Sequence, residues 1–186
     1  MRNRKNFHTG ILVSKDPSEY SFERNVNDLE GLRKDLGIKK WVVIGHSYGG
    51  MVAEAYALEF PNSVDKLVLS NTFYDAGNAA KVRSDPKGFN PQVYYRIVGA
   101  DGDFLIEEDI GKLDFRTELK RLKMPVLIMA GRFDRVSVPR FSVKFREYCP
   151  QAKFVMFEKS GHLPFIEQTG KYFRVLKAFA NWKRTS

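Results

Sequence analysis

Four short apolar runs along the chain alternate with longer segments in which apolar residues recur every three or four positions. The runs fall at 41–44, 66–70, 125–131 and 153–157. Such runs predict strands, because a strand inside a parallel sheet is covered on both faces and reads as a near-continuous apolar stretch. Strands that alternate with helices predict an α/β fold with a parallel sheet and right-handed crossovers.

The segments between the runs carry helical signals. The clearest covers residues 22–36, with Ser21 as the expected N-cap and Gly37 as the expected C-terminal cap. Four apolar residues lie on one face of this helix: Val26, Leu29, Leu32 and Leu36. Further helices are predicted for the segment that ends at Pro61, for 139–148 and for 171–182.

Two stretches depart from this alternation. Residues 1–20 carry weak signals apart from a short strand predicted at 8–13. Residues 71–123 are interrupted by glycine and proline, with short helical stretches near 90–98 and 116–123. We therefore interpret 71–123 as a helical cap insertion over the sheet, within a single domain that spans 1–186.

The composition excludes several classes of protein. Hydrophobic residues make up 43% of the 186 positions and charged residues 28%, as in globular proteins, and no apolar run approaches the ~20 residues that span a bilayer. The basic N-terminus lacks the apolar stretch of a secretory signal. The single cysteine, Cys149, excludes an intramolecular disulfide and suits a reducing compartment. We expect a cytoplasmic protein without a membrane partner.

The net charge of +9 raises the question of a nucleic-acid partner. The basic residues are scattered, however, and no motif interleaves them with aromatic residues. Lys120, Arg121 and Lys123 end a predicted helix, where cations are favourable next to the helix dipole. We expect no nucleic-acid partner.

Residues 45–49 read Gly-His-Ser-Tyr-Gly at the junction of the first predicted strand and the helix after it. A glycine-bracketed serine at such a corner is typical of the nucleophile elbow of acyl-transfer enzymes. The sharp turn strains the serine backbone and aims the Ser47 hydroxyl at solvent, while Gly45 and Gly49 are expected to remove side chains that would collide with neighbouring elements. The flanking strand and helix disfavour the alternative, an incidental serine in a glycine-rich turn.

A serine hydroxyl needs a general base, and the base needs a group that orients it. The chain has three histidines. His46 is a poor base for Ser47 because adjacent side chains diverge on a tight turn, and His8 lies in the weakly patterned N-terminal arm. His162, on the loop after the last predicted strand, is therefore the favoured base.

The acid should lie at the C-terminal end of another parallel strand, where functional loops gather. Asp134, just beyond the strand at 125–131, fits this position. The alternative for Asp134 is a surface carboxylate paired with Arg132 or Arg135. Asp75, after the strand at 66–70, is the competing acid.

The order Ser47, Asp134, His162 resembles that of the α/β-hydrolase fold family. The resemblance rests on residues 43–50, 125–134 and 160–165. Within the family the chain is most similar to the proline iminopeptidase and carboxylesterase branch, as residues 28–33 and 90–95 suggest. The resemblance implies a Ser-Asp-His triad that needs no cofactor or metal, with the Tyr48 backbone N–H as an oxyanion donor.

The chain departs from the family before the elbow, since only 46 residues precede Ser47. The family's first strands and the His-Gly loop that supplies its second oxyanion donor are not recognisable there. We therefore expect a truncated α/β-hydrolase-like fold: a mostly parallel sheet of about four to five strands flanked by helices. The elbow strand would then be an edge strand, and we expect a homodimer to cover it. The second oxyanion donor stays open.

The cap insertion should choose the substrate. Four candidate substrate-binding residues are aromatic side chains near the serine or in the cap: His46, Phe73, Tyr94 and Tyr95. Glu107, Glu108 and Asp109 could hold a free amino terminus, although a charge run is more often a solvated face. The expected function is hydrolysis of small acyl esters. The alternatives are a proline iminopeptidase-like aminopeptidase or amidase, and an inactive hydrolase-like binding module.

Overall fold

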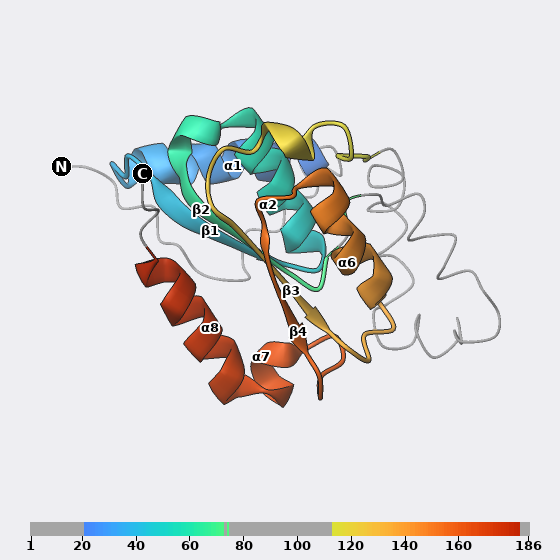
Figure 1. Cartoon of the computed structure of the whole chain (residues 1–186). Coiled ribbons are helices and arrows are strands. Elements are labelled where there is room, and N and C mark those ends of the chain that lie inside the picture. Colours follow the sequence, from blue (N-terminus) through green and yellow to red (C-terminus); the bar gives the residue numbers. More distant parts are fainter. Residues whose placement is uncertain (1–20, 73, 75–112, 183–186) are drawn as a thin grey trace.

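A four-stranded parallel sheet organises this computed structural model, which describes residues 21–72, 74 and 113–182 (Figure 1). The strands stand in the order β1-β2-β3-β4. Their bounds are Trp41–His46 for β1, Val64–Ser70 for β2, Val126–Gly131 for β3 and Lys153–Phe157 for β4. Each neighbouring pair is parallel, so all four strands present their C-terminal ends at the same edge of the sheet. The predicted α/β architecture is confirmed.

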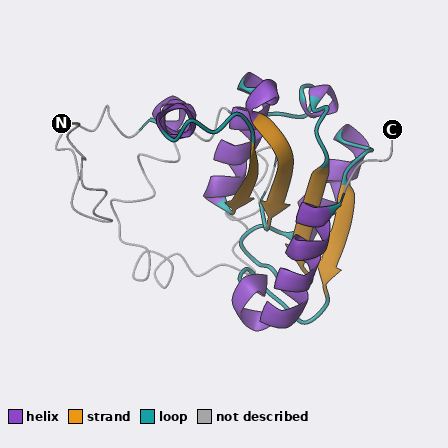
Figure 2. Cartoon of the chain, turned by 90° about the vertical axis from the view of Figure 1, so that its left-hand side faces the viewer, coloured by secondary structure: helices purple, strands orange, loops and turns teal. Residues whose placement is uncertain are grey.

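Helices cover both faces of the sheet (Figures 1 and 2). One face packs against α1, α2 and α6, which span Phe22–Asp35, Tyr48–Glu59 and Pro139–Tyr148. The other face packs against α8, Thr169–Asn181, which follows the short α7, Pro164–Glu167. Two 3₁₀ turns, η2 at Pro61–Ser63 and η3 at Leu119–Arg121, complete the described elements. No helix among the described residues is long and apolar enough to cross a membrane.

Local sequence signals set the limits of α1. The Ser21 hydroxyl accepts a hydrogen bond from the Arg24 backbone N–H at 3.1 Å, which satisfies a donor at the helix start. Gly37 follows the helix with a φ of 67°, a left-handed conformation that glycine adopts without strain. Both predicted caps are confirmed.

A buried carboxylate on α1, Glu30, joins this helix to the elbow helix α2. The Glu30 carboxylate accepts hydrogen bonds from the Arg33 guanidinium at 2.7 and 2.8 Å and from the Tyr56 hydroxyl at 2.8 Å. The hydrogen bond from Arg33 lowers the pKa of Glu30 to about 2, so the carboxylate stays ionised at neutral pH. This contact fixes α2, and with it the start of the elbow, against α1.

The short helical stretch predicted near 116–123 forms only in part, as the 3₁₀ turn η3 at Leu119–Arg121. Asp114 accepts hydrogen bonds from the Arg116 backbone N–H at 3.0 Å and from the Arg116 guanidinium, a local pattern that competes with helical bonding. Phe115 instead donates its N–H to the Tyr74 carbonyl at 2.9 Å, and only the 3₁₀ turn η3 follows. The predicted strand at 8–13 and helix at 90–98 lie outside the described residues.

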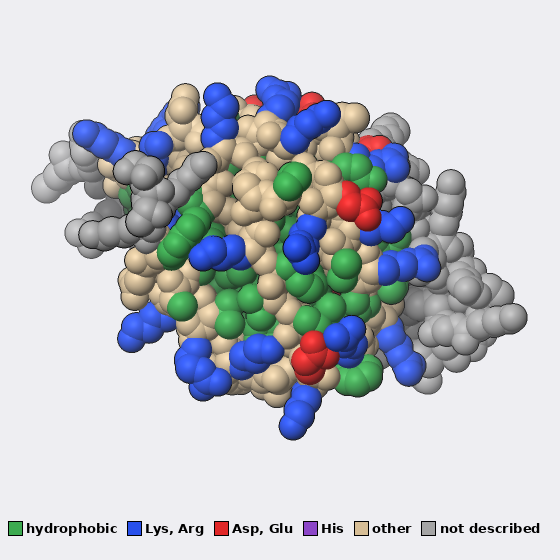
Figure 3. Space-filling view, viewed as in Figure 1, with side chains coloured by type: hydrophobic (Ala, Val, Ile, Leu, Met, Phe, Trp, Pro, Cys, Tyr) green, Lys and Arg blue, Asp and Glu red, His purple; other side chains and the backbone are tan. Residues whose placement is uncertain are grey.

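The strand β1 stands at one end of the sheet order, as the sequence predicts. Its outer side pairs with no strand among the described residues, and Val42 and Ile44 are 38% and 53% exposed. A groove of about 360 Å³ runs beside them, and Phe173 and Leu176 of α8 line its other side. On the face that Figure 3 shows, lysine and arginine side chains are dispersed among apolar ones rather than gathered in one patch.

Candidate active site

Ser47 occupies the sharp corner between β1 and α2. Its backbone has φ 53° and ψ −124°, a strained conformation that is uncommon for any residue except glycine. The surroundings hold it in place: the Ser47 N–H donates to the Ser70 carbonyl at 3.0 Å, and its carbonyl accepts from the Gly50 N–H at 2.9 Å and the Thr72 hydroxyl at 2.8 Å. The strained elbow that the sequence predicts is therefore present.

The glycines of the elbow differ in what they permit. A Cβ atom on Gly45 would lie 2.2 Å from the Gly49 carbonyl oxygen, so a side chain is excluded there as predicted. A Cβ atom on Gly49 would meet nothing within 4 Å, so the predicted collision at this position is wrong. The second tight position is Gly50, where a Cβ atom would lie 2.4 Å from the Thr72 side chain.

Asp134 and His162 are joined by a hydrogen bond of 2.9 Å between the carboxylate Oδ2 and the ring Nδ1. Asp134 follows β3 with its side chain fully buried, and His162 follows β4 with its side chain 22% exposed. The other carboxylate oxygen of Asp134 accepts the N–H groups of Val136 and Ser137 at 2.8 and 2.9 Å. Because an ionised carboxylate only accepts, Nδ1 carries the proton and Nε2 is left free to act as a base.

The surface ion pair considered for Asp134 does not form. Arg132 pairs instead with Glu158 of the neighbouring strand end, with nitrogen–oxygen distances of 2.7 and 2.9 Å. The pairing lowers the pKa of the Glu158 carboxyl and leaves Asp134 to its buried partners. Asp75, the competing acid, lies outside the described residues, as do Phe73, Tyr94 and Tyr95.

Asn71 is the residue that sequence reasoning missed. It directly follows β2, is fully buried, and donates its side-chain amide to Asp134 Oδ2 at 2.7 Å and to the Gly161 carbonyl at 3.1 Å. The available signal was its position, since a polar residue after a buried parallel strand lies at the same sheet edge as the other strand ends.

His46 contacts the histidine loop rather than an open cavity. Its Nε2 donates to the His162 carbonyl at 2.8 Å, and its ring lies 4.7 Å from the His162 ring and 5.2 Å from that of Phe165. Burial lowers the pKa of His46, so the ring stays neutral at neutral pH. Contact of His46 with substrate stays a prediction, but its hydrogen bond already ties the His162 loop to the residue beside Ser47.

The nucleophile and the base follow different strands and are not hydrogen-bonded to each other. Among the described residues no hydrogen bond joins the Ser47 hydroxyl to His162. Catalytic hydrogen bonds are often long in the absence of substrate and tighten in the reacting complex. Ser47, Asp134 and His162 follow β1, β3 and β4, so the parallel topology brings all three to one edge of the sheet.

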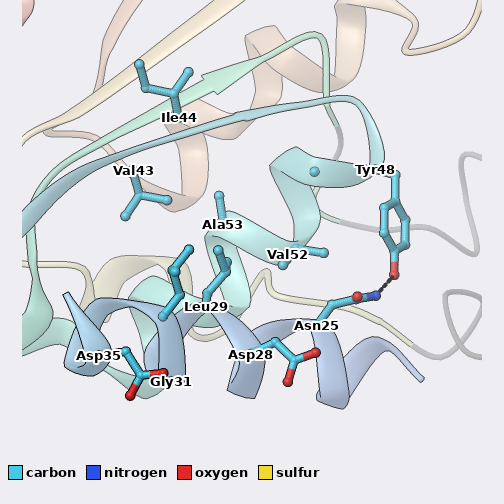
Figure 4. Close-up of a pocket in the computed structure, with 12 residues that line it drawn as sticks. Asn25, Asp28, Leu29, Gly31, Asp35, Val43, Ile44, Tyr48, Val52 and Ala53 are labelled. Atoms are coloured by element: carbon cyan, nitrogen blue, oxygen red, sulfur yellow. Dashed lines mark hydrogen bonds between the residues drawn. The ribbon is translucent and has the colours of Figure 1, made fainter. Parts of the chain in front are cut away.

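Tyr48 directly follows Ser47 and begins α2, so its backbone N–H lies in the first turn of the helix. Its hydroxyl accepts a hydrogen bond from the Asn25 amide at 2.8 Å, which joins the elbow to α1 (Figure 4). A trough of about 740 Å³ lies between α1, β1 and α2 and includes Leu29, Val43 and Val52 in its lining (Figure 4). The oxyanion role of the Tyr48 N–H stays a prediction.

Comparison with known proteins agrees with this fold. The model of the family described as alpha/beta hydrolase fold matches residues 10–108 and 94–169. The chain is 24% identical to a proline iminopeptidase of Heyndrickxia coagulans over 89% of its own length and 75% of that protein.

Solved structures are similar as well. A thermophilic esterase from Thermogutta terrifontis is 25% identical with a TM-score of 0.67, and 86% of this chain and 72% of that chain are covered. An enol-lactonase from Burkholderia xenovorans is 21% identical with a TM-score of 0.68, and the covered shares are 91% and 76%. The second likeness speaks for the fold alone.

Proposed function

The chain belongs to the alpha/beta hydrolase fold family, and from that premise we propose that it is a serine hydrolase with Ser47, Asp134 and His162 as its catalytic triad. One observation carries the proposal: the 2.9 Å hydrogen bond between Asp134 and His162 at the sheet edge that also holds the strained Ser47 elbow. A strained serine, a buried carboxylate and an imidazole, in this order along the chain, are the parts of an acyl-transfer site.

The proposed reaction proceeds through an acyl-enzyme. Ser47 attacks the substrate carbonyl while His162 Nε2 takes the hydroxyl proton, and Asp134 stabilises the imidazolium that forms. The tetrahedral intermediate collapses as His162 passes that proton to the leaving alcohol or amine. A water molecule, deprotonated by the same nitrogen, then attacks the acyl carbon, and the acid leaves as Ser47 recovers its proton.

Small acyl esters are the substrate class that we favour. The family resemblance implies one oxyanion donor, the Tyr48 backbone N–H, and the second donor is open. Loss of a single donor typically lowers turnover by about 10²–10³-fold. Esters have better leaving groups than amides and therefore tolerate an incomplete oxyanion hole. The esterase from Thermogutta terrifontis among the structural relatives supports this class.

Two further functions remain as alternatives. An aminopeptidase or amidase is favoured by the curated relatives, several of which are named proline iminopeptidase. An inactive binding module is the third, and the hydrogen-bonded Asp134–His162 pair argues against it.

One assay separates the three. Release of p-nitrophenol from acetyl and butyryl esters is measured beside release of naphthylamine from proline naphthylamide. We expect ester turnover that Ser47→Ala abolishes and that Ser63→Ala, a remote serine at η2, leaves unchanged. Amide-selective turnover would favour the aminopeptidase, and turnover of neither substrate would contradict the hydrolase proposal.

We propose a second copy of the chain as the partner at the β1 edge. The Ser47 N–H faces β2, so by the alternation of a strand the backbone groups of Val42 and Ile44 face outward. A two-fold axis at Val43 would pair Val42 of each copy with Ile44 of the other, on the same face of a continuous sheet. Each copy would then cover the apolar groove beside β1 of the other copy.

Light scattering on a dilution series tests the partner. We expect a dimer that Ile44→Arg converts to a monomer, while Ile166→Arg, at an isoleucine 64% exposed on α7, leaves the dimer intact. A wild-type monomer at all concentrations would contradict this partner.

We also propose a cytoplasmic location. The single cysteine, Cys149, is buried, and burial raises the pKa of its thiol to about 11. A neutral, inaccessible thiol without a disulfide partner suits a reducing compartment.

A further inference from the structure

We propose that Asn71 is a positioning residue that holds the Asp134 carboxylate and the His162 loop in one fixed arrangement. The proposal rests on the proposed function, because it assigns Asn71 to the same triad. Asn71 follows β2, the strand that contributes none of Ser47, Asp134 or His162.

The side-chain amide of Asn71 reaches both groups that it would position. One N–H donates to Asp134 Oδ2 at 2.7 Å, the same oxygen that faces His162 Nδ1 at 2.9 Å. The amide nitrogen also donates to the Gly161 carbonyl at 3.1 Å, one residue before His162. A single planar amide thus joins the acid to the backbone of the loop that carries the base.

Asn71 is itself held firmly. It is fully buried, its backbone N–H donates to the Met129 carbonyl of β3 at 2.8 Å, and its amide oxygen accepts from the Ser70 hydroxyl at 3.2 Å. An anchored donor fixes the rotation of the Asp134 carboxylate better than a mobile one, since the other oxygen is already held by two backbone N–H groups.

The Gly161 contact restrains the loop at a crowded point. A Cβ atom on Gly131, at the end of β3, would lie 1.9 Å from the Gly161 carbonyl oxygen, so the loop packs directly on the strand end. The Gly161 N–H donates to the Glu167 carboxylate at 2.6 Å, and His46 binds the His162 carbonyl at 2.8 Å. Asn71 adds a link from the Gly161 backbone to the acid, beside the hydrogen bond that His162 itself makes to Asp134.

The backbone of Asn71 offers a competing explanation. Its φ of 50° is left-handed, and asparagine is among the few residues besides glycine that adopt this conformation readily. Asparagine could therefore be present for its backbone alone. Glycine tolerates the same φ but has no amide, so Asn71→Gly separates the two roles where Asn71→Ala would not.

Removal of the Asn71 amide should change the proton affinity of the His162 ring in a predictable direction. The Asp134 carboxylate would lose one of its donors and attract a proton on His162 more strongly. The titratable groups that face Asn71 and its partners are Asp134, His162, His46 and Glu167, with Tyr172 of α8 near Ser70. Asparagine and glycine are both uncharged, so any change in the protonation of these groups reports the loss of the amide contacts.

The test compares Asn71→Gly with Asn181→Gly, an exposed asparagine at the end of α8. Steady-state ester hydrolysis gives kcat and KM across pH, and NMR titration of the His162 ring gives its protonation midpoint without substrate. For Asn71→Gly we expect kcat to fall about 10–100-fold with KM within about 2-fold. The His162 midpoint should lie above that of the wild type. Asn181→Gly should match the wild type in both.

Unchanged kcat and an unchanged His162 midpoint in Asn71→Gly would overturn the proposal and leave Asn71 with its backbone role alone. A fall in kcat with an unchanged midpoint would also contradict it, because the amide would then act elsewhere than through Asp134 and His162. Should the wild type hydrolyse no ester or amide, the proposed function fails, while the NMR titration still decides whether Asn71 acts on His162.

Discussion

The strands β1 and β3 have similar apolar sequences and very different surroundings. Every residue of β3 is buried, whereas exposed and buried residues alternate along β1. Ile128 on β3 is 1% exposed and Ile44 on β1 is 53% exposed. The difference follows from position, because β3 has strands on both sides and β1 has one neighbour among the described residues.

The proposed catalytic residues are held in place by two different parts of the sheet. Asp134 follows the fully buried strand β3 and His162 follows β4, its neighbour at the other end of the sheet order, and Asn71 and two backbone N–H groups fix the acid. Ser47 follows the edge strand, and the contacts of its backbone with β2, Gly50 and Thr72 hold its strained conformation. Asp134, held after the buried strand β3, positions the base, and the elbow after the edge strand β1 positions the nucleophile.

The largest expected effect comes from replacement of the acid, Asp134. Asp134→Asn keeps the volume of the side chain but cannot hold His162 in the tautomer that leaves Nε2 free. We expect kcat for ester hydrolysis to fall about 10³–10⁴-fold, the scale typical of replacing a triad acid by its amide. Asp65→Asn, at an exposed carboxylate on β2, serves as the matched control. Near-normal turnover in Asp134→Asn would move the acid to another residue.

A second pair of variants measures the two strands directly. Ile128→Ala should lower the free energy of unfolding by about 2–5 kcal/mol, because it leaves a cavity in the core. Ile44→Ala should lower it by less than about 1 kcal/mol, since the side chain is half in solvent. Urea unfolding at low protein concentration supplies both values. Equal losses would show that β1 is covered as fully as β3.

Substitutions at two glycines test the packing of the elbow. Gly45→Ala should cost about 1–3 kcal/mol and most of the activity, since its Cβ would press on the Gly49 carbonyl. Gly49→Ala should be neutral or stabilise by up to about 1 kcal/mol, because the site is open and the backbone is helical. Thermal unfolding of both variants gives the comparison, and a more damaging Gly49→Ala would contradict the described packing.

The smallest effect comes from Glu54, a fully buried residue of α2 whose carboxyl oxygens have no hydrogen-bond partner among the described residues. Burial raises its pKa well above the ordinary value of 4.5, so the folded state keeps it neutral. The unfolded state releases this proton above about pH 4.5, and the wild type therefore loses stability as the pH rises.

Glu54→Gln removes this pH dependence. We expect the variant to unfold a few degrees higher than the wild type at pH 8, with the gap shrinking toward pH 4.5. Glu59→Gln, at the exposed end of the same helix, should show no such trend. A gap that does not depend on pH would mean that Glu54 is ionised in the folded protein.

The elements with strong periodic signals could be predicted closely. The helix at 139–148 and the strand at 153–157 coincide with α6 and β4, and the Ser21 and Gly37 caps bracket α1. The helical stretch predicted near 116–123 is shortened to the 3₁₀ turn η3, and the Asp114–Arg116 contact occupies the residues before it. Local propensity could not reveal that contact.

The site was predictable where a motif fixes both residue and place. The order Ser47, Asp134, His162 pointed to the elbow and to the Asp134–His162 pair that the structure shows. Asn71 escaped because its role depends on three contacts between segments far apart in sequence. The prediction for Gly49 failed for the same reason. Only the packing shows that the crowded position is Gly50, next to the Thr72 side chain.

The most direct measurement of the central claim is covalent labelling of Ser47. A fluorophosphonate forms a bond to an activated serine oxygen and displaces fluoride, so intact-protein mass and peptide mapping report the site without any choice of substrate. We predict one adduct on Ser47 in the folded protein, absent in Ser47→Ala and greatly slowed in Asp134→Asn. No adduct on the folded wild type, or an adduct that persists in Ser47→Ala, would contradict the account.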